Sequence, residues 1–254
     1  METAIIKKLY YSPVKSLSFS NKNNLIIKKN VGIENDRIFA FTRLLDKEES
    51  FKYEKYPKYR NLNFLLTLKN SPYLNKYNFE FINDELLLFK YNKYINKISL
   101  YQNHNFEILS KELMNREKLI EKIPYFIQNK TFPFFDTSPY NSISLINLES
   151  IEDLEKKIDM KIEHERFRAN IYIKNADPWI EYDWLDKEIS INDCIFKVTK
   201  KIPRCSATNL VPGSDISNIN LPLKLKKIYD HINMGIYLIP LNNGIINIGN
   251  NLKF

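Results

Sequence analysis

The chain has 254 residues and a formal net charge of +8, and 44% of its residues are hydrophobic. This composition supports one large or two smaller folded domains and excludes a disordered chain. Lysine is spread along the whole sequence, so the charge indicates a solvated basic surface rather than a nucleic-acid-binding module. No apolar run approaches the ~20 residues of a membrane-spanning helix, and Lys7 and Lys8 interrupt the N-terminal apolar stretch. We expect a cytoplasmic protein without a nucleic-acid or membrane partner.

The counts of cysteine, histidine and glycine exclude several classes of site. The chain has only two cysteines, eleven residues apart, so we expect no disulfide framework. Its three histidines lie far apart without ligand spacing, so we expect no zinc site. The five glycines are too widely spaced for G-x-G-x-x-G or a Walker loop. Any phosphate group must therefore be held by side chains.

Most of the chain is predicted to form short strands. The clearest signals are two hairpins, one over 78–91 turning at Asn83-Asp84 and one over 188–198 turning at Asn192-Asp193. In the second hairpin Cys194 alternates with Phe196 and Val198, which predicts a buried structural thiol. Further strands are expected at 4–11, 24–29, 37–43, 62–69, 96–101, 169–174, 235–241 and 245–249.

Two helices are expected among the strands. The first covers 110–123 and begins with Ser110 as a plausible cap. The second covers 150–160, where Ser150 and Asp153 are spaced as a capping box. Both helices carry apolar residues at helical spacing, so each is expected to face a core.

A proline-rich, aromatic segment over 123–142 is expected to connect two domains. We place the domains at 1–128 and 129–254. Strands this numerous must close or stack to cover their edges. The predicted fold is therefore mainly β with a few helices (α+β), arranged as tandem β-barrel-like domains.

Four short polar clusters interrupt the apolar pattern. Each cluster alone is explained by an ordinary surface ion pair or a solvated strand face. Together they offer a lysine, several arginines, an asparagine and hydroxyls, which are groups that can hold a phosphate without a glycine loop. Their main members are Lys15, Ser16, Asp36, Arg37, Arg166, Arg168, Asn170, Arg204, Cys205 and Thr208.

Seven segments, in this order, resemble the MOSC family with its N-terminal β-barrel partner domain. They are "YSPVKS", "VGIENDRIFAF", "RFRANI", "PWIEYDWLDKEISI", "IPRCSATNLVP", "LPLK" and "MGIYLIPLNNGIINIGN". The resemblance runs from about residue 4 to the C-terminus. It implies β-barrel domains and a molybdenum cofactor with the cysteine of the R-C motif as its protein ligand, which is Cys205 here. A soft thiolate suits such a metal, and Arg204 would favour the deprotonated sulfur.

The resemblance also implies the residues that contact the cofactor. The expected contacts are Lys15, Ser16, Arg37, Ser150, Arg168, Asn170, Arg204 and Tyr237. The implied activity is a molybdenum-dependent oxidoreductase that reduces an N-hydroxylated or other N-oxygenated small molecule. No cysteine cluster for an iron–sulfur centre is present, so the electrons are expected from a separate ferredoxin, flavoprotein or cytochrome.

Two alternatives remain open at this point. The first is a molybdenum cofactor carrier or sulfur-transfer protein that uses a persulfide on Cys205. The second is a non-catalytic basic β-barrel that binds RNA or another anion, which only the net charge favours.

Overall fold

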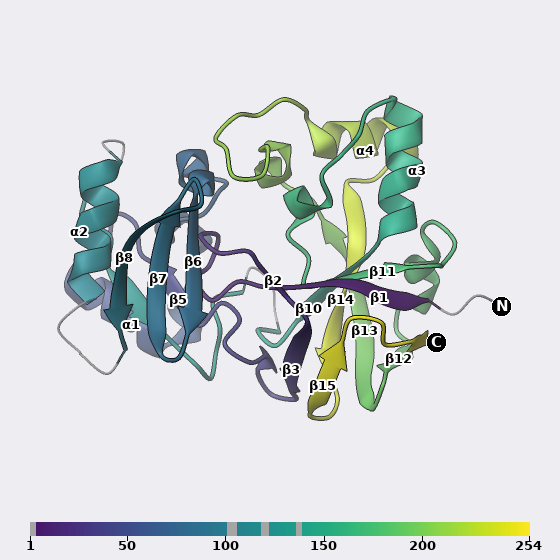
Figure 1. Ribbon diagram of the computed structural model, residues 1–254, viewed down its shortest axis with the longest axis horizontal. Helices are drawn as coiled ribbons and strands as arrows, with labels where there is room; N and C mark the ends of the chain where they lie inside the picture. The colour runs from purple at the N-terminus through teal and green to yellow at the C-terminus, as the bar shows by residue number, and fades with distance from the viewer. Residues whose placement is uncertain (1–3, 101–105, 118–121, 136–138) are drawn as a thin grey trace. The chain divides into compact units, whose positions relative to one another are not determined.

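The computed structural model describes residues 4–100, 106–117, 122–135 and 139–254. The fold is mixed α+β, with four α-helices among the described residues and strands in several sheets (Figure 1). Contacts divide the chain into two compact units: unit 1 comprises Met1–Tyr11, Asn21–Glu34 and Thr137–Phe254, and unit 2 comprises Ser12–Ser20 and Asn35–Asp136. The predicted boundary between residues 128 and 129 stays a prediction. Within the described residues, no helix is both long and apolar enough to cross a membrane.

The α-helices are α1 (Lys47–Lys55), α2 (Phe106–Arg116), α3 (Leu148–Ile158) and α4 (Leu221–Tyr229). The strands are β1 (Ile5–Tyr11), β2 (Ser20–Lys22), β3 (Asn24–Lys28), β4 (Gly32–Ile33), β5 (Phe39–Phe41), β6 (Tyr77–Ile82), β7 (Glu85–Lys90), β8 (Lys93–Ser99), β9 (Phe126–Gln128), β10 (Ile143–Asn147), β11 (Ile171–Lys174), β12 (Glu188–Ile191), β13 (Cys194–Pro203), β14 (Asn233–Pro240), β15 (Gly244–Asn247) and β16 (Leu252–Lys253). The short 3-10 helices referred to below are η2 (Leu62–Phe64), η4 (His164–Phe167), η5 (Ile180–Trp184) and η6 (Ser206–Asn209).

Unit 1 is built on an eight-stranded sheet. Its strand order is β16-β12-β13-β14-β10-β11-β1-β2, and β10 and β11 are parallel to each other. The start of β1 also contacts the end of the chain, because the Leu252 amide donates to Ala4 and the Ile6 amide donates to Asn250, at 2.8 and 2.9 Å. An isolated bridge between Ile5 and Asn251 lies in the same place. The sheet thus curls toward itself in a barrel-like way, through a bridge rather than a named strand pair.

The core of unit 1 lies inside this sheet. It is made of fully buried aliphatic and aromatic side chains from most of its strands, including Leu145, Phe196 and Leu238. The helices α3 and α4 lie beside each other (Figure 1). Strand β14 passes so close to β10 that a Cβ on Gly235 would lie 2.4 Å from the Leu145 carbonyl oxygen, and Gly235 has a φ of +79°. Only glycine fits at this position without strain.

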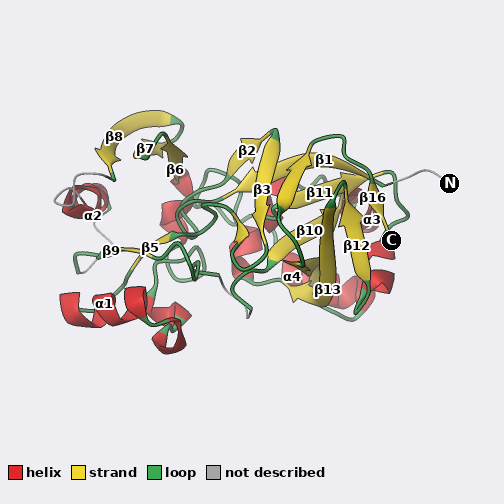
Figure 2. Ribbon diagram, turned by 90° about the horizontal axis from the view of Figure 1, so that it is seen from below, coloured by secondary structure: helices red, strands yellow, loops and turns green. Residues whose placement is uncertain are grey.

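The described residues of unit 2 form two small sheets and two α-helices. The strands β6, β7 and β8 form an antiparallel meander, and β5 pairs with β9 (Figure 2). Helix α2 packs against β8 and β9, and helix α1 packs against β9. Phenylalanine rings fill the interior: Phe39 stacks on Phe126 at 5.1 Å between ring centroids, and Phe41 lies 5.8 Å from Phe79.

Both predicted hairpins are confirmed. Strands β6 and β7 pair on either side of Asn83-Asp84, which have φ angles of 49° and 58°, as a tight hairpin turn requires. Strands β12 and β13 pair on either side of Asn192-Asp193. Cys194 is fully buried among the core residues, and burial raises the pKa of its thiol, so the prediction of a structural cysteine is confirmed.

Other local predictions are wrong in whole or in part. No strand forms over 62–69 except an isolated bridge at Leu65, and the segment begins with the 3-10 helix η2. The first predicted helix lies earlier, as α2, so Ser110 is inside the helix rather than at its cap. The expected strand over 96–101 is observed as β8 up to Ser99, and residue 101 lies outside the described residues. Helices α1 and α4 are additional to the two that were expected.

Candidate functional site

Cys205 lies two residues after Pro203, the last residue of β13, and is exposed to solvent. Its backbone is held on both sides. The amide of Arg204 donates to the Ile232 carbonyl at 2.9 Å, which continues the pairing of β13 with β14. The carbonyl of Cys205 accepts from the amide and the hydroxyl of Thr208, at 3.1 and 2.8 Å, as η6 begins. The thiol is therefore accessible on a backbone that is fixed by hydrogen bonds.

Arg204 points into the protein. Its Nη1 donates to the Phe167 carbonyl and its Nε donates to the Met234 carbonyl, both at 2.9 Å, and Nη2 also donates to Met234. The guanidinium carbon lies 5.4 Å from the centre of the Phe167 ring. Burial lowers the pKa of Arg204, while nearby tyrosines and Cys205 act in the opposite direction. Arg204 thus ties the segment of Cys205 to two other parts of unit 1.

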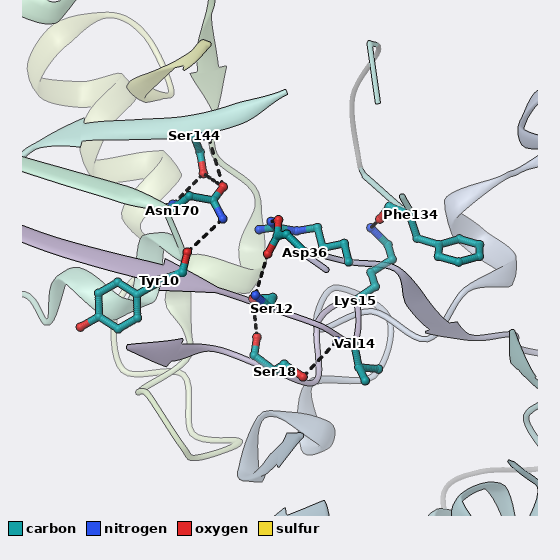
Figure 3. A network of polar contacts seen from close by, with 10 residues as sticks. Tyr10, Ser12, Val14, Lys15, Ser18, Asp36, Phe134, Ser144 and Asn170 are labelled. Carbon is teal, nitrogen blue, oxygen red and sulfur yellow. Dashed lines mark hydrogen bonds and ion pairs between the residues drawn. The ribbon is translucent and has the colours of Figure 1, made fainter. Parts of the chain in front are cut away.

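Arg168 and Asn170 lie directly after the segment that Arg204 holds. Arg168 ends η4 in a left-handed conformation, with a φ of 52°. Asn170 is buried and bridges two strands: its Nδ2 donates to the Tyr10 carbonyl at 3.2 Å, and its Oδ1 accepts from the Ser144 hydroxyl at 2.8 Å (Figure 3). The amide of Asn170 in turn donates to the Ser144 hydroxyl at 2.9 Å. These bonds fix the short connection from Arg168 to β11.

Tyr237 belongs to the same part of the sheet. It lies in β14 and pairs with Ser144 on β10, the residue that binds Asn170. On the other side it pairs with Lys200, whose ammonium lies 5.8 Å from the centre of the Tyr237 ring. The structure therefore links Arg168, Asn170, Arg204 and Tyr237 through adjacent strands and hydrogen bonds.

Ser150 has a different environment. It is fully buried in the first turn of α3, and its hydroxyl donates to both carboxylate oxygens of Glu181 at 3.0 Å. The same hydroxyl accepts from the Trp179 amide at 2.8 Å. The cap of α3 is Asn147, whose side chain accepts from the Glu149 amide, so the predicted capping box at Ser150 is wrong. The role of Ser150 as a cofactor contact stays a prediction.

Lys15, Ser16 and Arg37 lie in unit 2. The amide of Lys15 donates to the Phe39 carbonyl at 2.8 Å, so the segment that carries Lys15 and Ser16 lies beside the one that follows Arg37. Lys15 is buried, and its ammonium donates to the Phe134 carbonyl at 3.1 Å (Figure 3). Arg37 forms an ion pair with the buried Asp36, and its guanidinium lies 4.5 Å from the centre of the Phe135 ring.

Asp36 organises this second group. Its Oδ1 accepts from the Ser12 amide at 2.6 Å, while its Oδ2 pairs with Arg37. The Ser12 hydroxyl donates to the Ser18 carbonyl at 2.6 Å, and the Ser18 hydroxyl accepts from the Val14 amide at 3.1 Å (Figure 3). The loop that carries Lys15 and Ser16 is therefore closed by its own hydrogen bonds.

Three predicted contacts share an uncommon backbone conformation. Among the described residues, fifteen other than glycine have a positive φ, and nine of them are Asn or Asp, which tolerate it. The remaining six are Ser16, Arg37, Leu44, Tyr91, Arg168 and Trp179. Half of this set was predicted from the sequence to contact a cofactor. Strained backbone is concentrated at functional sites in proteins, because the surrounding structure must support it.

The predicted residues thus form two groups. Lys15, Ser16 and Arg37 belong to unit 2, and the other six belong to unit 1. Within unit 1, sequence reasoning missed Ser144, which joins Asn170 to Tyr237, and Tyr10, whose hydroxyl contacts His164 Nε2 at 3.0 Å. Neither residue stands out in the strand pattern. The gathering of both groups at one pocket stays a prediction.

Residues 135–253 match the MOSC domain family. The chain contains a MOSC domain. The resemblance to the MOSC family is confirmed for residues 135–253, which include Cys205, Arg168 and Asn170. The N-terminal β-barrel partner domain stays a prediction.

Part of the chain is similar to curated proteins at low identity. The chain is 32% identical over 104 residues to mitochondrial amidoxime reducing component 2 of Rattus norvegicus, which covers 41% of this chain and 29% of the relative. It is 29% identical over 96 residues to mitochondrial amidoxime-reducing component 1 of Homo sapiens, which covers 38% and 27%. The matched part therefore spans about a third or less of the length of these two relatives.

A solved structure aligns with nearly the whole chain. The YUAD protein from Bacillus subtilis superposes with a TM-score of 0.45 at 13% sequence identity, over 98% of this chain and 94% of that chain. YiiM from Geobacillus stearothermophilus superposes with a TM-score of 0.34 over 43% of this chain and 52% of that chain, at 18% identity.

Proposed function

We propose that this protein is a molybdenum-cofactor-binding oxidoreductase that reduces N-hydroxylated or other N-oxygenated small molecules with electrons from a separate protein. Two kinds of similarity support the proposal. The chain contains a MOSC domain, a domain that is associated with molybdenum cofactor binding. Curated relatives that match part of the chain are named for the reduction of amidoximes.

The observation that carries the proposal is the contrast between the Cys205 thiol and its neighbour. Cys205 is exposed, while Arg204 is buried and holds three backbone segments together. An accessible thiolate on a fixed backbone can bind a soft metal, and molybdenum with sulfur ligands is such a metal. The donor chemistry of this site therefore fits the cofactor that the domain implies.

Each residue of the site then has a definite task. Cys205 Sγ would be the protein ligand of the metal. Arg168, presented in a left-handed turn, and Asn170, held by Ser144, would bind and orient the polar groups of the cofactor. Lys15 and Arg37 would add positive charge for its phosphate. A buried and a partly buried cation, held next to hydrogen-bonded loops, supply such a field at little cost in reorganisation.

When bound, the cofactor supplies the two-electron redox chemistry. In the overall reaction the N–O bond of the substrate breaks, and the oxygen leaves as water after the uptake of two electrons and two protons. The chain contributes metal ligation, orientation and a positive field. The electrons must be delivered by a separate donor, as the sequence predicts.

The test is purification from a host that makes molybdenum cofactor, followed by metal analysis and pterin fluorescence after oxidation. We expect about one molybdenum and one pterin for each chain. With dithionite-reduced methyl viologen as the electron source, the protein should convert benzamidoxime to benzamidine. Protein that is loaded with cofactor but converts no N-hydroxylated substrate would contradict the oxidoreductase assignment.

A second function shares the same thiol. The exposure of Cys205 also suits a persulfide, so the protein could transfer sulfur or carry the cofactor without turning over a substrate. Cyanide-labile sulfur in protein that lacks molybdenum would favour this function. Protein with neither molybdenum nor labile sulfur would contradict both functions.

A further inference from the structure

Helix α4 has an unusual charge pattern. Its sequence, LPLKLKKIY, has three lysines and no acidic residue, whereas each of the other three described α-helices carries acidic side chains. Lys226 is paired with Asp230 at 2.7 Å. Lys224 and Lys227 are exposed and lie three positions apart, which places them on one side of the helix. This side of α4 is therefore positively charged.

The helix lies next to the turn that follows Cys205. Helix α4 packs against η6, which begins at the residue after Cys205. The Asn209 side chain, at the end of η6, accepts from the Leu221 amide at 3.0 Å and so fixes the start of α4. The Asn209 carbonyl accepts from Arg166 Nη1 at 2.9 Å. The basic helix thus packs against the short turn that directly follows Cys205.

Two large apolar side chains, on α4 and in the loop before it, are also exposed. Leu223, on the same side of α4 as Lys227, is 48% exposed, and Ile216, in the loop between η6 and α4, is 62% exposed. In contrast, Leu221 and Leu225 are fully buried and attach the helix to the unit. Exposed apolar residues with a charged rim are typical of the small interfaces of transient redox complexes.

We propose that Leu223, Lys224, Lys227 and Ile216 form a docking surface for an acidic electron-transfer protein. The inference rests on the proposed function, which requires electrons from a separate donor. The charge of the surface is complementary to an acidic partner, and charge complementarity steers such encounters and raises their association rate. Its position next to the Cys205 turn would bring the donor close to the site that it reduces.

The experiment measures binding of an acidic plant-type ferredoxin by isothermal titration calorimetry at low and moderate salt. The test variant is Lys224→Glu/Lys227→Glu. A matched control, Lys187→Glu/Lys253→Glu, makes the same change in net charge at exposed positions, and Lys253 lies on the strand next to β12, away from the Cys205 end of β13. We expect Kd to rise about tenfold or more in the test variant and about twofold or less in the control. Moderate salt should weaken wild-type binding and reduce this difference.

Turnover separates this inference from the proposed function. With reduced ferredoxin as donor, kcat/KM for benzamidoxime should fall about tenfold in the test variant, and turnover with reduced methyl viologen should not change. A wild-type protein that is inactive with both donors would contradict the proposed function, while the binding data would still decide the docking surface. Equal losses of ferredoxin binding in test and control variants would overturn the inference. So would a loss of binding to anionic vesicles or RNA without a loss of ferredoxin binding.

Discussion

The two ends of strand β13 place the same type of side chain in opposite environments. At the start of the strand, Cys194 is fully buried among the apolar residues of the unit 1 core. Two residues past the end of the strand, Cys205 is exposed and follows the buried Arg204. Burial raises the pKa of the Cys194 thiol, so this sulfur stays protonated and unreactive.

This contrast shows that the packing around a cysteine decides its chemistry. Apolar core residues surround Cys194, and a Cβ added to Gly244 would lie only 2.5 Å from its sulfur, so no room is left for a ligand. At the other end, hydrogen bonds from Arg204 and Thr208 hold the chain while the Cys205 sulfur faces solvent. The strand separates a structural thiol from a candidate metal ligand.

The largest effect is expected from exchanging each cysteine for alanine. Cys205→Ala should lower molybdenum content and benzamidoxime reduction by roughly 100-fold or more, because loss of a ligand exceeds the 10–100-fold effects of outer-shell changes. Its melting temperature should stay within about 2 °C of wild type, since an exposed side chain contributes little to stability. Metal analysis, an activity assay and a thermal melt check this prediction.

Cys194→Ala serves as the matched control. It should lower the free energy of unfolding by about 1–2 kcal/mol, because it leaves a small cavity, and it should keep its molybdenum. A Cys205→Ala protein with wild-type metal content, or a Cys194→Ala protein without metal, would reverse the assignment of the two thiols.

The next largest effect is expected from replacing Arg204, whose side chain fixes the backbone next to the exposed Cys205. Arg204→Met keeps the length of the side chain but removes its donors from the carbonyls of Phe167 and Met234. The loss should cost about 2–4 kcal/mol of stability, because two buried acceptors lose their partner. Urea denaturation measures this cost.

Arg204→Lys tests the same contacts with a more conservative substitution. A lysine can satisfy one carbonyl but cannot reach two in the fork geometry of a guanidinium, so its stability should lie between wild type and Arg204→Met. Equal stability of Arg204→Met and wild type would show that the three bonds contribute nothing to the fold.

The sequence predicted the β-hairpins of this fold better than its helices. Asn83-Asp84 and Asn192-Asp193 are local turn signals, and both hairpins form where they were expected. Helix α1 also has a local signal, the capping box of Asp46 and Glu49, which was overlooked. Helix α4 begins with Leu221 and Pro222 after an Asn220 cap and has only nine residues, so its periodic pattern is too short to stand out.

The candidate site was predictable only in part, because the roles of its residues depend on distant contacts. The R-C motif singles out Cys205, and its exposure agrees with a ligand role. The motif cannot show that the Arg204 guanidinium binds two backbone carbonyls from other segments. Nor can it show that the Ser150 hydroxyl binds Glu181, thirty-one residues away. Such contacts are made by the tertiary fold, which local patterns do not contain.

Glu181 is a second titratable group in the interior of unit 1. It tests whether burial disfavours the charged form of this carboxyl as it does for the Cys194 thiol. This carboxyl is fully buried, and burial raises its pKa to about 7. The native protein then holds a proton that the unfolded chain releases near pH 4.5. The stability from this group is fully present below about pH 4.5 and is lost as the pH rises toward 7, by an amount on the order of 3 kcal/mol.

Glu181→Gln should remove this part of the pH dependence. Its free energy of unfolding, measured by urea denaturation between pH 4.5 and 7.5, should fall less steeply with pH than that of wild type. Glu85→Gln, at a partly exposed surface ion pair with Lys97, is the control and should keep the wild-type slope between pH 4.5 and 7.5. Parallel curves for wild type and Glu181→Gln would contradict burial as the cause.

The smallest effect is the coupling free energy expected between Cys194 and Gly244. A Cβ on Gly244 would lie 2.5 Å from Cys194 Sγ, whereas its next nearest contact is the Cys194 Cβ at 3.9 Å. Gly244→Ala should therefore cost about 1–3 kcal/mol through overpacking against a single sulfur. In the Cys194→Ala background the added methyl group fills the space of that sulfur, so the two changes should compensate by about 1 kcal/mol. A double-mutant cycle by urea denaturation measures the compensation, and strictly additive costs would show that Cys194 does not fill the space beside Gly244.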